Sequence, residues 1–265
     1  MTEATPPARP TLGIAVLTLN EAQRIEACLR SAAFADQVVV IDSGSTDDTR
    51  ERAARLGAEV HQHPDWQGFG VQRSRALDHL RTDYVFFLDA DEEISAGLQA
   101  EITRAVASGE DAAWRVWWDE VAFGRALTRM KSRGGIQRLF RRATLERFDG
   151  AVHEAPVLRH AVPVRALRQR LLHHSRTTVY GSLRKLAQYV QLGAAKRGAQ
   201  GKKGGVLRGL VMGTVVFLRV YLFQRAFLCG GPGFLYAQFI ALETFFRYAA
   251  LRYDMHDGPG ELARR

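Results

Sequence analysis

Polar side chains follow three apolar segments in the first part of this 265-residue chain. They are, in chain order, Thr18, Asn20 and Glu21, then Asp42, and then Asp89 and Asp91. Because ligands of an open parallel sheet bind beyond the carboxyl ends of its strands, we expect these side chains to gather at one site. Asp89 and Asp91 are two residues apart, so in extended backbone both carboxylates can point the same way. One or two carboxylates together with substrate phosphates are the usual ligands of Mg²⁺, so the pair predicts a site for Mg²⁺ or Mn²⁺.

The segments that must position these residues alternate between strand and helix patterns. Continuous apolar runs, typical of strands buried on both faces of a sheet, lie at residues 13–19, 38–41 and 84–88, and residues 58–62 can form a further strand. Helical patterns follow the expected N-cap Asn20 and recur over residues 46–56, 71–80 and 95–107. This alternation predicts an α/β fold with a mostly parallel, Rossmann-like sheet and helices on both faces.

Several other kinds of site lack support in the sequence. No GxxxxGK[ST] motif occurs and no GxGxxG follows the first strand, which argues against a P-loop NTPase and a dinucleotide-binding enzyme. Cys28 and Cys229 lack any metal-ligand spacing, so neither a disulfide framework nor a cysteine zinc site is expected. His173 and His174 can in principle supply a metal ligand, but no spacing fixes a partner, and a packed or exposed histidine pair is the favoured interpretation.

Four ordered motifs carry a resemblance to a known family. They are TLNE at residues 18–21, VVVIDSGSTDDT at 38–49, Gln72-Arg73 with Ala76-Leu77, and FLDADEEIS at 87–95. Together they resemble the nucleotide-sugar domain of family 2 glycosyltransferases, which have the GT-A fold. Within that family the chain is most similar to the bacterial group that extends the lipopolysaccharide core, often as β-1,4-glucosyltransferases. The match covers residues 12 to about 155.

The resemblance implies roles for the matching residues. Thr18 and Glu21 are expected to line the nucleotide pocket, Asp42 to hydrogen-bond the uracil or ribose, and Arg73 to lie near the base and diphosphate. Asp89 is expected to face the ribose or donor sugar. The metal ligand implied in this comparison is Asp91. The chain departs from the family at Ser74, where asparagine is common, and at Ser43, where a second aspartate is common.

An inverting transferase also needs a general base that takes the proton from the acceptor hydroxyl, while the metal stabilises the departing diphosphate. Acids are scarce downstream of the nucleotide-binding part, the candidates being Asp119, Glu120, Glu146, Asp149 and Glu154. We expect Glu154 to be the base, since a similar Val-His-Glu segment recurs in the lipopolysaccharide-core group.

Structural alternatives exist for the same residues. Asp42 can be an ordinary turn former, and the acidic run at residues 89–93 can be a solvated helix start. Arg73 can be a surface helix residue, and Glu154 can lie at a strand edge without catalytic duty. The buried strands that precede Asp42 and Asp89 favour the ligand-binding interpretation for those two residues.

Charge is divided unevenly along the chain, whose formal net charge is +9. Residues 1–150 carry 19 Lys and Arg against 23 Asp and Glu, whereas residues 151–265 carry 18 against 5. A base-rich part favours an anionic partner, either nucleic acid or an anionic membrane surface. The tail also holds apolar residues at helical spacing over residues 206–222, and this combination favours helices that lie in a membrane interface.

A membrane-spanning helix is not expected from this tail. The charge-free stretch at residues 209–218 is half the roughly twenty residues that a span requires. The next apolar pattern is interrupted by Gly-Gly-Pro-Gly at residues 230–233, which is expected to separate two helices. Packing on the catalytic domain or a dimer face is the equally weighted alternative to membrane binding.

These observations together predict three regions: a disordered lead-in at 1–10, a GT-A catalytic domain at 11–175, and a helical, basic membrane-surface region at 176–265. The catalytic domain divides into a nucleotide-sugar part at 11–110 and an acceptor part at 111–175. The resemblance implies inverting transfer of a hexose, expected to be glucose, from a UDP-sugar to a lipid-linked saccharide such as the lipopolysaccharide inner core. The expected location is the cytoplasm, at the inner face of the cytoplasmic membrane, because MTEATPPARP lacks a signal-peptide pattern.

Two alternatives belong to other classes of protein. A metal-dependent sugar nucleotidyltransferase also suits paired acids on such a sheet, although the chain lacks an obvious glycine-rich loop for a triphosphate. A nucleic-acid-binding protein would exploit the basic half. We do not expect a nucleic acid partner, because the positive residues accompany long apolar stripes and no recognised nucleic-acid motif is present.

Overall fold

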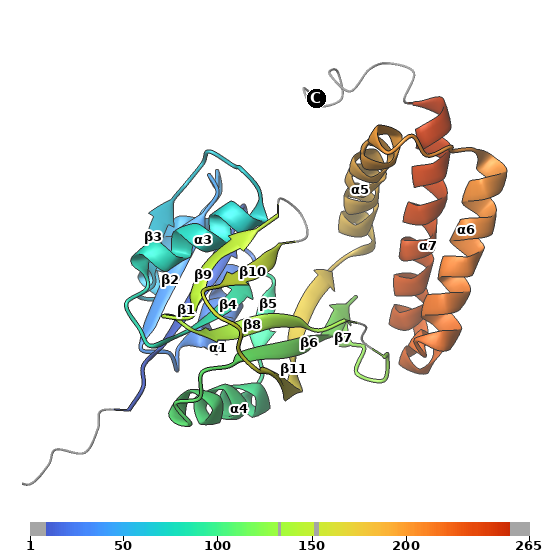
Figure 1. Ribbon diagram of the computed structural model, residues 1–265. Coiled ribbons are helices and arrows are strands. Elements are labelled where there is room, and N and C mark those ends of the chain that lie inside the picture. The colour runs from blue at the N-terminus through green and yellow to red at the C-terminus, as the bar shows by residue number, and fades with distance from the viewer. Residues whose placement is uncertain (1–8, 132–133, 151–153, 255–265) are drawn as a thin grey trace, which may run out of the picture. The chain divides into compact units, whose positions relative to one another are not determined.

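The computed structural model describes residues 9–131, 134–150 and 154–254 (Figure 1). The chain divides into two compact units. The first contains the residues up to Trp118 together with those from 133 to His173, and the second contains Asp119 to 132 together with His174 onward. The predicted disordered lead-in lies outside the described residues, apart from Arg9 and Pro10.

Four parallel strands form the centre of the first unit. Their order in the sheet is β3-β2-β1-β4, and they are β1 (Leu12–Thr18), β2 (Gln37–Asp42), β3 (Glu59–Gln62) and β4 (Tyr84–Asp89). The register sets Thr18 opposite Asp42, and Leu17 opposite Asp89. The polar residues that follow β1, β2 and β4 therefore share one edge of the sheet, as predicted.

Helices cover both faces of this sheet. They are α1 (Ile25–Ala32), α2 (Thr49–Arg55), α3 (Phe69–His79) and α4 (Ala96–Ala107). Alternate residues of β4 point to opposite faces. Phe86 packs in the layer with α1 and α4, and Phe87 packs with α3. The predicted α/β class with a Rossmann-like GT-A core is confirmed.

Beyond β4 the sheet contains antiparallel pairings. The order continues β8-β6-β11-β5, namely β8 (Ile136–Arg141), β6 (Ala113–Ala122), β11 (Val164–Arg176) and β5 (Glu92–Ile94). The pairings β4–β8, β8–β6 and β11–β5 are all antiparallel. A separate hairpin joins β9 (Leu145–Asp149) to β10 (Ala155–Leu158). The acidic run after β4 enters the short strand β5, so the alternative of a solvated helix start is wrong.

Asn20 does not cap the first helix, which begins five residues later at Ile25. Its backbone is left-handed, with a φ of 54°, a conformation that asparagine tolerates better than most residues. The side-chain Oδ1 accepts a hydrogen bond of 2.8 Å from the N–H of Thr46. The cap prediction is therefore wrong, and Asn20 instead joins the loop after β1 to the loop after β2.

The second unit is mainly helical. Its described elements include β7 (Arg125–Ala126), α5 (Val179–Ala199), α6 (Val206–Leu218), the π-helical turn η1 (Arg219–Phe223), the 3₁₀ turn η2 (Ala226–Cys229) and α7 (Gly230–Tyr253). The Gly-Gly-Pro-Gly segment forms the first turn of α7, where proline's missing N–H costs no helical bond. Gly230, whose φ is 65°, separates η2 from α7, so the predicted break lies at the first residue of this segment. A second break precedes it at Arg225, whose φ is 63°.

Glycines form the face of α6 that packs on α7. A Cβ added at Gly209 would lie 2.7 Å from the carbonyl oxygen of Phe245, and one added at Gly213 would lie 3.2 Å from that of Ala241. The close approach leaves large apolar side chains of α6 on other faces, and Leu207 is 75% exposed. Within the described residues, Val206–Phe223 is long and apolar enough to cross a membrane by length and composition, with 22% of it buried.

Candidate active site

Asp89, at the end of β4, lies between two buried arginines. Arg73 of α3 donates through Nη2 to Oδ1 at 2.8 Å and to Oδ2 at 3.1 Å. Arg138 of β8 donates through Nη2 to Oδ2 at 2.8 Å. Burial alone would raise the pKa of Asp89, but the positive charges of Arg138 and Arg73 outweigh it and lower the pKa. Asp89 is therefore a carboxylate held in place by one residue of helix α3 and one residue of strand β8.

Arg73 also binds the predicted base. Its Nε donates to Oε1 of Glu154 at 2.8 Å, across 81 positions of sequence. One guanidinium thus links Asp89 to Glu154, which precedes β10. The Val-His part of the motif before Glu154 lies outside the described residues.

The start of α3 docks against the β9–β10 hairpin and brings Arg73 and Glu154 together. The N–H of Gly70 donates to the carbonyl of Gly150 at 3.1 Å, and a Cβ at Gly70 would lie only 2.6 Å from that oxygen. Ser74 accepts a hydrogen bond of 2.9 Å from the N–H of Phe148 through its hydroxyl. Ser74, the departure from the family pattern, therefore helps to hold the hairpin.

Glu92 is a buried member of the site that the sequence did not single out. Its Oε1 accepts from Nε1 of Trp118 at 2.5 Å and from Nη2 of Arg138 at 3.0 Å, and its Oε2 accepts from the N–H of Asp89 at 2.9 Å. Burial raises the pKa of Glu92, although Arg138 opposes this. Glu92 orients both Arg138 and the backbone at Asp89.

Arg138 is thus the positively charged partner of two buried carboxylates, Asp89 and Glu92, and we expect its charge to stabilise the folded protein. We expect Arg138→Leu to lower the free energy of unfolding by about 3–5 kcal/mol, since Asp89 and Glu92 would lose a buried partner. Urea denaturation measures this change. The control is Arg115→Leu, an exposed arginine of β6 for which a change within about 0.5 kcal/mol is expected. A loss at Arg138 no larger than at Arg115 would contradict the ion-pair account.

Asp91 lies beside His173 of β11, with 3.5 Å between Oδ2 and Nε2. Burial opposes ionisation of Asp91, but the hydrogen bond and charge of His173 prevail and lower its pKa. Among the described residues, no three His, Cys, Asp or Glu side chains gather as a metal site. One carboxylate with an adjacent imidazole nevertheless suits a divalent cation whose other ligands are substrate phosphates and water. The sequence spacing of His173 and His174 did not indicate that His173 lies beside Asp91.

Asp42 points into its own turn. It is fully buried, and its Oδ1 accepts from the N–H groups of Gly44 at 3.1 Å and Ser45 at 2.9 Å, while Oδ2 accepts from the Ser45 hydroxyl. This is the geometry that the turn-former alternative describes. Thr18 lies opposite Asp42 on the neighbouring strand β1. Its hydroxyl is buried and lacks a hydrogen-bond partner among the described residues.

The carboxylate of Glu21 receives two hydrogen bonds from Arg24, of 2.6 and 2.9 Å. Its backbone N–H donates to the hydroxyl of Thr49 at 2.8 Å. Glu21 therefore lies in the loop after β1, tied to the start of α2, and its side chain is 20% exposed.

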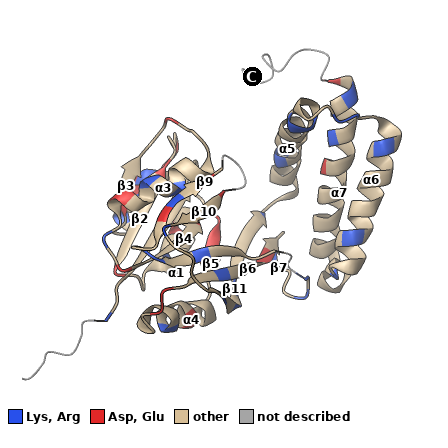
Figure 2. Ribbon diagram, in the orientation of Figure 1, with Lys and Arg blue, Asp and Glu red and all other residues tan. Residues whose placement is uncertain are grey.

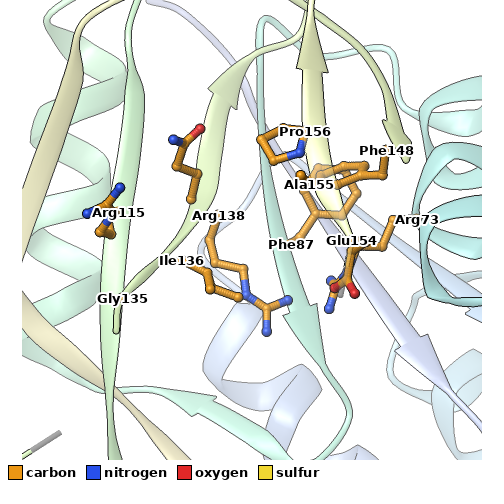
Figure 3. Close-up of a pocket in the computed structure, with 11 residues that line it drawn as sticks. Arg73, Phe87, Arg115, Gly135, Ile136, Arg138, Phe148, Glu154, Ala155 and Pro156 are labelled. Carbon is orange, nitrogen blue, oxygen red and sulfur yellow. The ribbon is translucent and has the colours of Figure 1, made fainter. Parts of the chain in front are cut away.

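A pocket of about 190 Å³ opens next to the Arg73, Arg138 and Glu154 side chains (Figure 3). Strands β4, β6 and β8, helix α3 and the β9–β10 hairpin contribute its lining, which consists of Arg73, Phe87, Arg115, Gly135, Ile136, Gln137, Arg138, Phe148, Glu154, Ala155 and Pro156. Sites for whole small molecules usually measure about 300–1,000 Å³. The pocket therefore suits one part of a substrate.

Comparisons with known proteins show the family of this chain. The sequence model described as glycosyl transferase family 2 matches residues 14–173. A protein of Rickettsia felis named an uncharacterized glycosyltransferase is 29% identical over 267 residues, covering 94% of this chain and 92% of that protein. The lipopolysaccharide core biosynthesis glycosyltransferase LpsC of Rhizobium meliloti is 27% identical over 253 residues, covering 91% of each.

A similar solved structure is that of glucosyl-3-phosphoglycerate synthase from Mycobacterium tuberculosis in complex with Mn²⁺ and UDP-glucose. Its TM-score is 0.41 at 20% identity, with 68% of this chain and 77% of that chain covered. Since the family model spans more than half of the sequence and includes every site residue described above, the chain belongs to glycosyl transferase family 2 and is a glycosyltransferase.

Proposed function

We propose that this glycosyltransferase transfers a hexose from a UDP-sugar to a lipid-linked saccharide such as the lipopolysaccharide inner core. The hexose is glucose, and its anomeric configuration is inverted in the transfer. The observation that carries the proposal is the Glu154–Arg73–Asp89 chain of hydrogen bonds at the edge of the pocket. It links Glu154, the candidate base, through Arg73 to Asp89 at the end of β4. The similarity to LpsC over 91% of both chains supports a saccharide acceptor of the lipopolysaccharide core.

The donor nucleotide would bind at the ends of β1 and β2. The buried hydroxyl of Thr18, which has no hydrogen-bond partner among the described residues, suits a hydrogen bond to the nucleotide. Glu21 lies in the loop that follows it. Asp42 would act through the turn at Gly44 and Ser45 that it holds, because its own side chain is fully buried. Asp89, held by two arginines, would accept hydrogen bonds from the hydroxyls of the ribose or donor sugar.

Asp91 and His173 are the residues that would hold Mg²⁺ or Mn²⁺. When bound, the metal neutralises the charge that develops on the departing diphosphate. Asp91 is suited to this position because carboxylate oxygens are ligands that both cations prefer. The Nε2 atom of His173, on β11, lies 3.5 Å from its Oδ2 and can provide the neighbouring ligand.

Glu154 would remove the proton from the attacking acceptor hydroxyl. A bond forms between that oxygen and the anomeric carbon, the bond from this carbon to the diphosphate oxygen breaks, and UDP leaves. Attack from the face opposite the diphosphate inverts the anomeric configuration. Arg73 holds Oε1 of Glu154, while Oε2 has no hydrogen-bond donor among the described residues and is available to the acceptor.

Thermal unfolding of the purified chain with a panel of nucleotide sugars, with Mn²⁺ present, tests the donor class. We expect stabilisation by UDP-sugars, since ligands that bind the native state raise its stability. Stabilisation by nucleoside triphosphates alone, with release of pyrophosphate, would instead support a sugar nucleotidyltransferase. The absence of a shift with every nucleotide sugar would contradict the proposal.

The helical unit would bind the inner face of the cytoplasmic membrane, where a lipid-linked acceptor resides. From residue 174 to 254 the acidic residues are Glu243 and Asp254 alone, whereas Lys and Arg occur along α5, α6 and α7 (Figure 2). Exposed apolar side chains accompany them on α6, including Leu207 and Leu210. Basic residues beside exposed apolar ones favour an anionic membrane over nucleic acid.

The double variant Leu207→Glu with Leu210→Glu tests this membrane proposal. Because it replaces apolar contact by negative charge, we expect binding to vesicles containing anionic phospholipid to fall about tenfold or more. Cosedimentation measures this binding. Leu56→Glu, at an exposed leucine of the first unit, is the matched control. Equal vesicle binding by the double variant and the control would contradict the proposal.

A further inference from the structure

We propose that the pocket in Figure 3 binds an anionic group of the acceptor saccharide, a phosphate or a carboxylate, through Arg115 and Arg138. This inference rests on the proposed transfer to a saccharide. It goes beyond that function by requiring that the acceptor carry a negatively charged group.

The first observation is a set of buried donors without partners. Arg73 and Arg138 are 3% and 2% exposed, and both line the pocket. Nη1 of Arg73 and both Nε and Nη1 of Arg138 have no hydrogen-bond partner within the described part of the chain. Buried N–H groups are nearly always satisfied, so donors left over beside a pocket indicate a ligand that accepts hydrogen bonds.

The second observation is the charge of the lining. Three arginines, Arg73, Arg115 and Arg138, face a single acid, Glu154. Glu154 is already bonded to Arg73, and the other partners of the buried arginines, Asp89 and Glu92, do not line the pocket.

Arg115 adds a positive charge that no described residue neutralises. It is exposed at the pocket and makes no ion pair within the described ranges. A phosphate or carboxylate would neutralise this charge, and arginine is well suited to bind either group through two parallel hydrogen bonds.

The position of the pocket assigns the anion to the acceptor rather than to the donor. Asp91, the proposed metal ligand, is not part of the lining, whereas Glu154 is. A general base must lie within hydrogen-bond reach of the hydroxyl it deprotonates, so the acceptor has to approach Glu154. Phe87, Phe148 and Pro156 provide apolar surface for the C–H face of a sugar ring. The volume of about 190 Å³ suits one charged sugar rather than a nucleotide sugar.

Arg115→Gln tests the proposal in steady-state transfer from UDP-glucose to lipopolysaccharide core oligosaccharide. We expect the acceptor KM to rise about tenfold, the effect of losing one charge-assisted hydrogen bond, with the KM for UDP-glucose unchanged within about twofold. Arg115→Lys, which keeps the charge, should recover part of the loss. Arg104→Gln, at an exposed arginine of α4 that does not line the pocket, is the control for the charge change.

Modified acceptors identify the anionic group. One arm uses core oligosaccharide dephosphorylated with aqueous hydrogen fluoride, and a second uses carboxyl-reduced oligosaccharide. With one of these two modified acceptors, the KM of the unmutated enzyme should rise as much as it does in Arg115→Gln with the unmodified acceptor. The KM of Arg115→Gln for that modified acceptor should not rise further. An unchanged acceptor KM in Arg115→Gln would overturn the inference. A rise in the KM for UDP-glucose alone would assign the anion to the donor and overturn it too.

Direct binding separates failure of this inference from failure of the proposed function. Inorganic phosphate and methyl glucuronide are titrated calorimetrically, at low ionic strength, into the full chain and into Arg115→Gln. We expect at least one of them to bind the unmutated chain and to bind the variant about tenfold more weakly. Equal binding to both, or to neither, would overturn the pocket assignment whether or not sugar transfer is observed. Absence of transfer with binding intact would contradict the proposed function alone.

Discussion

Replacing Asp91 by asparagine is expected to lower kcat for sugar transfer by about 100-fold or more, the scale on which a metal ion stabilises a departing diphosphate. Asparagine preserves the size of the side chain and removes its negative charge. Since His173 would be the remaining protein ligand near the diphosphate, the variant should also require a much higher Mn²⁺ concentration for half-maximal activity. Initial rates across a Mn²⁺ titration measure both effects.

The control for Asp91 is Asp78→Asn, at an exposed aspartate of α3, which should retain full activity at every Mn²⁺ concentration. His173→Gln should show a smaller loss, of about tenfold, because water can replace an imidazole in the coordination of a hard cation. Undiminished transfer by Asp91→Asn, or transfer that persists in excess EDTA, would contradict the assigned role of Asp91.

The second large effect is expected at Glu154. Glu154→Gln should reduce transfer by about 10²–10⁴-fold, the usual contribution of a positioned general base. A glutamine oxygen can still accept the hydrogen bond from Nε of Arg73, so the fold of the site and the affinity for UDP-glucose should change little. Rates of transfer and the Kd of UDP-glucose, measured on the same preparations, separate the loss of chemistry from a loss of binding.

Glu146→Gln, at an exposed acid in the neighbouring strand β9, is the matched control and should transfer sugar normally. Retention of more than about a tenth of the activity by Glu154→Gln would assign the proton transfer to another group.

The central part of the fold could be predicted because it depends on local patterns. Apolar runs such as residues 84–88 are long enough to identify buried strands, and the carboxyl ends of parallel strands lie at the same edge. The observed register of β1 with β2 and β4 therefore places Thr18, Asp42 and Asp89 where the sequence predicted.

The second half of the site could not be predicted because it depends on antiparallel pairing between distant segments. Glu92, Arg138 and Trp118 meet because β5, β8 and β6 join one sheet, and nothing in their spacing sets that register. The sequence offered one indication that Glu92 belongs to the site, namely that it directly follows Asp91 in the acidic run after β4. Likewise, His173 reaches Asp91 because β11 pairs with β5.

One local prediction failed because a tertiary contact overrides local preference. Asn20 is a residue type that favours helix caps, but its side chain instead binds Thr46 of another loop. The break expected at Gly-Gly-Pro-Gly lies at its first residue, Gly230, and the other three residues belong to the first turn of α7, where proline is tolerated.

The most direct test of the central claim is the anomeric configuration of the product. The purified chain is incubated with Mn²⁺, UDP-glucose labelled with ¹³C in the sugar, and lipopolysaccharide core oligosaccharide, and the product is followed by NMR. Because the glucose of UDP-glucose is α-linked, inversion by a single attack assisted by Glu154 predicts a β-linked glucose and an equal amount of UDP, both formed about 100-fold or more slowly by Glu154→Gln. An α-linked product, or β-linked product formed by Glu154→Gln at more than about a tenth of the unmutated rate, would contradict it.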